Sequence, residues 1–166
     1  MSRAELKTYK RSKYKEALLV GGCFALGALP VSALIILWMM NAPPRWLILT
    51  STIAAFIAGT ILWGTVFGHG RRPTFWRGVG VGALVVAMAQ PLAWYLLFLL
   101  LYFSGEPGSL PAATVHPLGG LLASFAYGAL SLLFSGWITI PVGGAIGGAL
   151  GYAGGKEWEN WAGHKG

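Results

Sequence analysis

The chain has 166 residues, a net charge of +7 and no aspartate, and 55% of its residues are hydrophobic. A soluble domain of this length cannot hide so much apolar surface, which excludes a water-soluble fold. The Lys and Arg residues flank long apolar runs instead of forming one basic face, which argues against a nucleic-acid-binding protein. The single cysteine, Cys23, rules out an internal disulfide.

Four long runs contain no Lys, Arg or Glu. The runs are Ala17–Met40, Trp46–Phe67, Gly78–Phe103 and Leu118–Tyr152. Each is longer than the roughly 18 apolar residues that indicate a transmembrane helix. The sequence therefore predicts an all-α integral membrane protein, a single domain of four transmembrane helices over residues 17–155.

The first run follows a basic tail, residues 1–16, so this region superficially resembles a signal peptide with a cleavage site at Val31-Ser32-Ala33. The apolar stretch, however, continues past that site to Met40, which is longer than a cleavable segment should be. We expect an uncleaved first span over residues 17–40, with a second span over residues 46–67.

Basic residues are distributed unevenly among the segments outside the runs. The N-terminal tail holds six Lys and Arg residues, the first loop one, the second loop three, the third loop none and the C-terminal tail two. Because cytoplasmic segments are enriched in Lys and Arg, four spans with both termini cytoplasmic are favoured. With such short loops, this pattern is typical of a bacterial cytoplasmic (inner) membrane.

The second loop carries most of its charge in one cluster. His69, Arg71, Arg72 and Arg77 lie close together in the sequence, beside the expected inner surface. They are candidates for contact with an anionic inner-leaflet lipid or another phosphate. The simpler interpretation is that the arginines only set the topology.

The third span, residues 78–103, contains the dipeptide Gln90-Pro91. Gln90 shares a helical face with Ala83, Ala87 and Trp94, so we expect its amide to point at a neighbouring helix and not at lipid. Pro91 removes a backbone hydrogen bond and should kink the helix. A structural role is favoured, and a substrate-binding or gating kink is the alternative.

The fourth run is too long for one perpendicular span. From Leu118 to Gly155 no charge occurs over 38 residues, which would make a straight helix of about 57 Å. We predict a span over residues 118–140, a kink at Pro141, a Gly-rich helical continuation over residues 141–155 and a C-terminal tail over residues 156–166. The alternative is five spans, in which the chain turns near Ser135-Gly136 and places the C-terminus outside.

Small residues recur at helical spacing and indicate close helix contacts. The strongest pattern is a glycine zipper after Pro141. Its members are Gly143, Gly147, Gly151 and Gly155. Three weaker stripes of small residues occur at the same spacing in other parts of the chain: Gly21/Ala25/Ala28/Ser32, Ser51/Ala55/Gly59 and Ser124/Gly128/Ser131/Ser135. The zipper could bind a partner or a second copy, or could pack within the chain against the first or third span.

No catalytic or metal-binding set is evident. Glu106 and His116 share a loop, but two titratable residues ten apart are weak support for acid–base catalysis. No cofactor is indicated. The leading hypothesis is a non-enzymatic membrane protein that acts through helix–helix contacts, as an accessory or assembly subunit or a partner-binding protein. The alternative is a passive channel or small-solute permease formed by homo-oligomerisation, and a lipid-modifying enzyme ranks last.

Overall fold

The computed structural model describes residues 3–39, 45–67, 73–104 and 116–163, and these residues form four helices and no strand. The helices are α1 (Arg3–Met39), α2 (Arg45–Phe67), α3 (Phe75–Ser104) and α4 (Pro117–Gly163). All four are long and apolar enough to cross a membrane. The prediction of an all-helical protein with four candidate spans is therefore confirmed.

Backbone hydrogen bonds close the first turn of α3 and of α4. The Gly78 amide donates to the Thr74 carbonyl over 2.9 Å at the start of α3, and the Gly120 amide donates to the His116 carbonyl over 3.0 Å at the start of α4. Pro117 occupies the first position of α4, where a missing amide hydrogen has no consequence. The basic N-terminal segment from Arg3 onward continues directly into the first span as part of α1.

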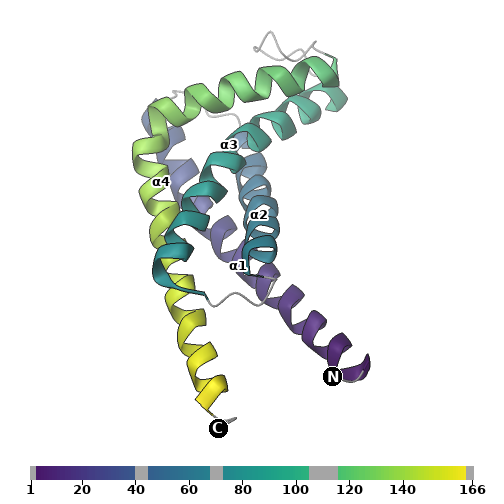
Figure 1. The fold of residues 1–166 in the computed structure, drawn as a ribbon. Coiled ribbons are helices and arrows are strands. Elements are labelled where there is room, and N and C mark those ends of the chain that lie inside the picture. Colours follow the sequence, from purple (N-terminus) through teal and green to yellow (C-terminus); the bar gives the residue numbers. More distant parts are fainter. Residues whose placement is uncertain (1–2, 40–44, 68–72, 105–115, 164–166) are drawn as a thin grey trace.

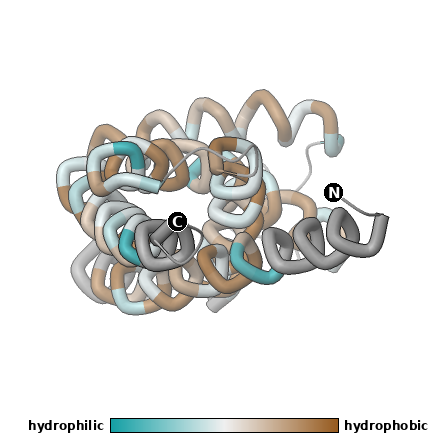
Figure 2. The backbone as a smooth tube through the Cα atoms, turned by 60° about the horizontal axis from the view of Figure 1, so that its bottom comes forward, coloured by the Kyte–Doolittle hydropathy of each residue, from teal (hydrophilic) through white to brown (hydrophobic). Residues whose placement is uncertain are grey.

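The two ends of the chain lie at the same end of the bundle (Figure 1). Helix α1 contacts α2, α2 contacts α3 and α3 contacts α4, whereas α1 and α4 make far fewer contacts with each other. Apolar residues lie on every side of the helices and not only toward the core (Figure 2). Leu19, Leu26, Leu122 and Leu133 are all more than two-thirds exposed, as expected for helices that face lipid.

The packed core occupies the half of the bundle nearer the termini. Its buried members come from α1, α2 and α3, and Ile146 and Leu150 of α4 pack against them. They are Val20, Phe24, Ala58, Trp63, Phe67, Val81 and Val85. At the α1–α2 crossing, a methyl group added to Gly21 would lie 2.8 Å from the Phe56 carbonyl oxygen. Glycine is therefore required for these helices to approach so closely.

Glycines of both helices bring the α3 and α4 backbones together in the same half. A methyl group on Gly82 would lie 3.2 Å from Gly147 Cα, and one on Gly78 would lie 3.2 Å from Gly151 Cα. Further along, a methyl group on Gly155 would lie 2.9 Å from the Pro73 carbonyl oxygen. The glycine zipper of α4 thus lies against a matching Gly78/Gly82 pair on α3 of the same chain.

Both α3 and α4 bend part-way along, and their connected halves leave the bundle together as a helical hairpin (Figure 1). We call residues 91–104 and 117–134 the arm. In α3 the bend is explained by Pro91, which has no amide hydrogen to donate to the Ala87 carbonyl. Within the arm, Tyr127 packs on Trp94 and Phe98, with ring centroids 5.1 Å and 5.7 Å apart.

Helix α4 is continuous through its bend. Ser135 and Gly136 are both helical, so the chain does not reverse direction there as a five-span arrangement would require. Two successive side chains return hydrogen bonds to the preceding turn: Ser135 Oγ to the Ser131 carbonyl over 2.8 Å, and Thr139 Oγ1 to the Ser135 carbonyl over 3.1 Å. Such bonds bend helices, and Pro141 adds the loss of one backbone bond.

Candidate functional site

The register between α3 and α4 changes across the bend. In the glycine interface, four residues of α3 are matched by four residues of α4, since Gly78 lies against Gly151 and Gly82 lies against Gly147. Between the Gly82–Gly143 contact and the Gln90–Ser131 hydrogen bond, however, α3 advances eight residues and α4 advances twelve. Helix α4 is therefore about 6 Å longer than α3 over this stretch and bows away from it.

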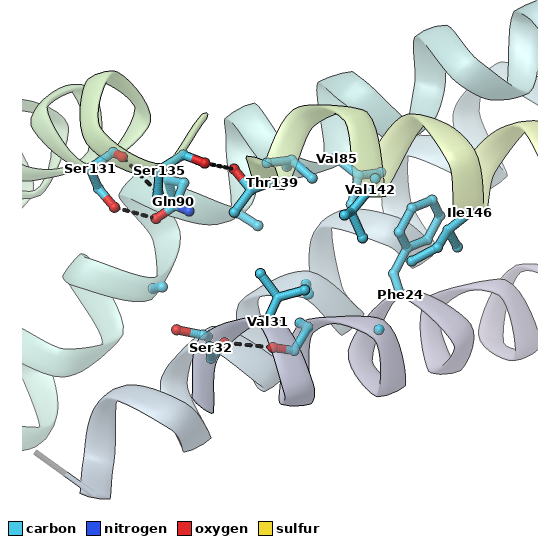
Figure 3. Close-up of a pocket in the computed structure, with 18 of the residues that line it drawn as sticks. Phe24, Val31, Ser32, Val85, Gln90, Ser131, Ser135, Thr139, Val142 and Ile146 are labelled. Atoms are coloured by element: carbon cyan, nitrogen blue, oxygen red, sulfur yellow. Dashed lines mark hydrogen bonds between the residues drawn. The ribbon is translucent and has the colours of Figure 1, made fainter. Parts of the chain in front are cut away.

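A cavity of about 130 Å³ lies beneath this bow, in the centre of the bundle and partly open to the surroundings. All four helices contribute to its wall. The residues that matter most for its chemistry are labelled in Figure 3, with Val31 and Ser32 of α1 on the opposite side from Gln90 of α3 and Thr139 of α4. Ser51 and Leu47 of α2 complete the ring.

The cavity is closed toward the chain termini. Phe24 and Ile146 form its floor, and a methyl group on Gly27 would meet the Ile146 side chain, so α1 and α4 are in contact there. Below this floor lies the packed apolar core that includes Trp63 and Val81. The cavity is thus a blind pocket in this conformation.

Hydroxyl groups line one part of the wall. Ser32 Oγ donates to the Ala28 carbonyl over 2.6 Å, and Ser51 Oγ donates to the Leu47 carbonyl over 2.7 Å. Ser135 and Thr139 make the equivalent bonds on α4 and are only 6% and 7% exposed. These serines and the threonine come from three different helices, and the fold brings them to one space.

Gln90 connects α3 to α4 at the edge of the cavity. Ser131 Oγ donates to Gln90 Oε1 over 2.9 Å. Within the part of the chain that the structure describes, no group accepts a hydrogen bond from the Gln90 amide nitrogen. One turn further along the arm, Gly128 packs directly on Pro91, since a methyl group there would lie 2.8 Å from Pro91 Cα.

The cavity wall is mainly apolar, with a few polar groups and no charge: none of the described residues that line it is Lys, Arg, His, Glu or Cys. Across the described ranges, no three His, Cys or Glu residues are grouped as a metal ion would require. The hydroxyls, the amide and the apolar side chains of this wall can bind a molecule through hydrogen bonds and apolar contact.

The candidate residues from the sequence are therefore separated in space. Gln90 lies in the cavity wall, whereas Gly143, Gly147, Gly151 and Gly155 lie mainly in the α3–α4 interface, and only Gly143 also lines the cavity. Arg77 is exposed in the first turn of α3. His69, Arg71 and Arg72 fall outside the described residues, as does Glu106, the suggested partner of His116.

Several cavity residues were found in the sequence for a different reason. Ala28, Ser32, Ser51, Ala55, Ser131 and Ser135 belong to the small-residue stripes that predict helix contacts. Thr139 was missed because it follows Ser135 by four residues but is not small. The sequence pattern that indicates a shared polar space is the occurrence of hydroxyl residues at comparable depth on three predicted spans.

The described residues define an all-helical bundle with four candidate membrane spans and an uncharged pocket at its centre. A comparison of the chain with protein-family models, with curated proteins and with solved structures finds no match.

Proposed function

We propose that this chain is a non-catalytic membrane protein that holds a small uncharged molecule in its central cavity. The observation that supports the proposal most strongly is the composition of the wall: hydroxyls, one amide and the Trp94 indole border a space otherwise lined by Gly, Ala, Val, Leu, Ile and Phe. Binding pockets are typically apolar with a few placed polar groups. A bundle that needed only stability would fill this space with side chains.

The size of the cavity fits a ligand of a few heavy atoms or one ring. Its volume of about 130 Å³ is close to that of an engineered apolar cavity, about 150 Å³, that binds benzene. Ionised molecules are disfavoured, because no described wall residue offers a countercharge and burying an isolated charge is very costly.

The blind end favours binding over passage. A channel or permease would need a path through the Phe24–Ile146 floor and the apolar core beneath it. Homo-oligomerisation through the zipper is also less favoured, because Gly147 and Gly151 already contact α3. Ser131 and Ser135, which a pore would use, support a binding pocket equally well.

An accessory subunit that binds a protein partner is the second candidate, and the arm favours it. Phe103, Leu122 and Leu133 project from the arm with 77–78% of each side chain exposed. Helices could dock on this surface. The glycines of the small-residue stripes give a partner less support, since they lie in α1–α2 and α3–α4 contacts within the chain.

Native mass spectrometry of the protein purified from its own membranes in mild detergent separates these candidates. The ligand-binding proposal predicts one chain that carries a neutral small molecule, and an Ala28→Leu variant, which fills the cavity from α1, should lose that mass. The control is Ala126→Leu, because Ala126 is exposed on α4 and does not line the cavity. A chain without a small molecule, in fixed stoichiometry with another protein, would favour the accessory subunit instead.

For the membrane setting, we propose a bacterial inner membrane with both termini cytoplasmic. The excess of Lys and Arg in the N-terminal tail and second loop supports this orientation. The placement of both chain ends at one end of the bundle is compatible with it (Figure 1). Arg77 is exposed near that end and could contact anionic lipid headgroups.

A further inference from the structure

We infer that the cavity selects uncharged molecules that carry a hydroxyl or N–H hydrogen-bond donor, such as alcohols and primary amides, over molecules that only accept hydrogen bonds. This inference rests on the proposed ligand-binding function and specifies its ligand class. It follows from the hydrogen bonds that the donor hydrogens of the cavity wall already make.

Every wall hydroxyl already donates its single hydrogen. Ser32, Ser51, Ser135 and Thr139 donate to carbonyls in their own helices, and Ser131 donates to Gln90 Oε1. The donor–acceptor distances lie between 2.6 and 3.1 Å. A hydroxyl has one hydrogen but two lone pairs. These five side chains therefore face the cavity as acceptors.

Turning a hydroxyl toward an acceptor-only ligand would break its present bond. An intramolecular hydrogen bond contributes on the order of 1 kcal/mol, and an apolar environment strengthens it. The hydroxyls of Ser135 and Thr139 would be the hardest to turn, because both side chains are more than nine-tenths buried and both donate to carbonyls in the same bent stretch of α4. A ligand that brings its own hydrogen needs no such rearrangement.

Gln90 adds one complementary feature. Its carbonyl oxygen is used by Ser131, and its two amide hydrogens have no acceptor among the described residues. The described wall side chains thus present five hydroxyl acceptors and two donor groups, the Gln90 amide and the Trp94 indole. An alcohol satisfies both kinds at once, since its oxygen accepts from Gln90 while its hydrogen bonds a serine or threonine oxygen. A ketone or ether can satisfy only the donors and leaves the hydroxyl acceptors unused.

Cyclohexanol and cyclohexanone test the inference, because they share a ring size and differ mainly in the donor hydrogen. Each is titrated into the full-length, valine-methyl-labelled protein in detergent micelles and followed by NMR. Val31, Val85 and Val142 line the cavity and report binding there, whereas Val20, Val66 and Val81 do not line it and report nonspecific uptake into the micelle. The cavity valines should shift saturably with both probes.

We expect cyclohexanol to bind about tenfold more tightly than cyclohexanone, the ratio that one net hydrogen bond provides. Equal affinities, or tighter binding of the ketone, would overturn the donor preference and leave the ligand-binding function standing. Shifts that stay linear and equal at all six valines would overturn both, because neither probe would then occupy the cavity.

A matched pair of serine variants assigns the preference to the wall. Ser135→Ala should bring the affinity ratio to within about threefold, because it removes a buried acceptor. Ser124→Ala should keep the full ratio: Ser124 is also buried in α4 and bonds to the Leu121 carbonyl, but it does not line the cavity. If Ser135→Ala fails to fold, Thr139→Val serves in its place, and an unchanged ratio in a folded variant contradicts the assignment.

Discussion

Gly82 of α3 and Gly147 of α4 are in backbone contact. A methyl group on Gly147 would lie 2.9 Å from Gly82 Cα, and one on Gly82 would lie 3.2 Å from Gly147 Cα. Neither position leaves room for any other residue without separating the helices. Gly82 also meets Gly143, and that contact marks one end of the bow that creates the cavity, with the Gln90–Ser131 hydrogen bond at the other end.

Gly147→Ala should therefore destabilise the protein strongly. The new methyl group would meet backbone atoms, which cannot rotate away, so we expect a loss of about 2 kcal/mol or more in the free energy of unfolding. Unfolding in mixed micelles measures it. Gly80→Ala is the control, because nothing lies within 4 Å of a methyl group on Gly80. A Gly147→Ala variant as stable as the Gly80→Ala variant would show that the helices are not this close.

The Gln90–Ser131 bond should contribute a small coupling energy. Interhelical hydrogen bonds in membrane proteins average about 0.6 kcal/mol in double-mutant cycles. We expect a coupling energy of this size from a double-mutant cycle that compares Gln90→Leu, Ser131→Ala and the double variant with the unchanged protein. The free energies of unfolding are measured by the same method. Strict additivity of the two single changes would mean that the bond is absent in the folded protein.

Pro91→Ala should straighten α3 and displace the arm. Alanine restores an amide hydrogen for the Ala87 carbonyl and removes the ring that prevents a regular helix. The native Cys23 and an introduced Leu122→Cys, both exposed, provide sites for spin labels on α1 and on the arm. The distance between the labels should change by several ångströms. An unchanged distance would show that the contacts of Gly128 and Tyr127, and not the proline, hold the bend.

Tags on the two termini should report the same side of the membrane. The charge distribution predicts that both are cytoplasmic. Added protease should therefore cleave neither tag in intact spheroplasts and both after lysis. A tag in the third loop, which has no basic residue, should be cleaved in intact spheroplasts. Cleavage of only one terminal tag would contradict an even number of spans.

The number and approximate limits of the helices could be predicted from the sequence, because charge-free runs of this length have few alternatives to helices in a membrane. Predicted span limits lie within three residues of α2 and α3. The continuity of α4 through Ser135 was harder to predict, since serine, glycine and proline permit either a bend or a turn. Its side-chain bonds to the preceding turn favour the bend.

The cavity could not be predicted in the same way. It depends on α4 advancing four more residues than α3 between two contacts, which is a relation between helices and not a property of either one. The stripe Ser131/Ser135 predicts a helix contact equally well whether the neighbouring space is filled or open. For the same reason, the Gly78/Gly82 pair could be recognised as the counterpart of the zipper only once the register was known.

The most direct test of the account is to locate a small uncharged alcohol in the protein. Crystals of the full-length protein soaked briefly in 2-bromoethanol would reveal the probe by anomalous scattering from bromine. The proposed ligand-binding function predicts one bromine site between Val31, Gln90 and Thr139, absent from crystals of the Ala28→Leu variant. Bromine only on the lipid-facing surface or at Cys23 would contradict the central claim that this bundle holds a ligand.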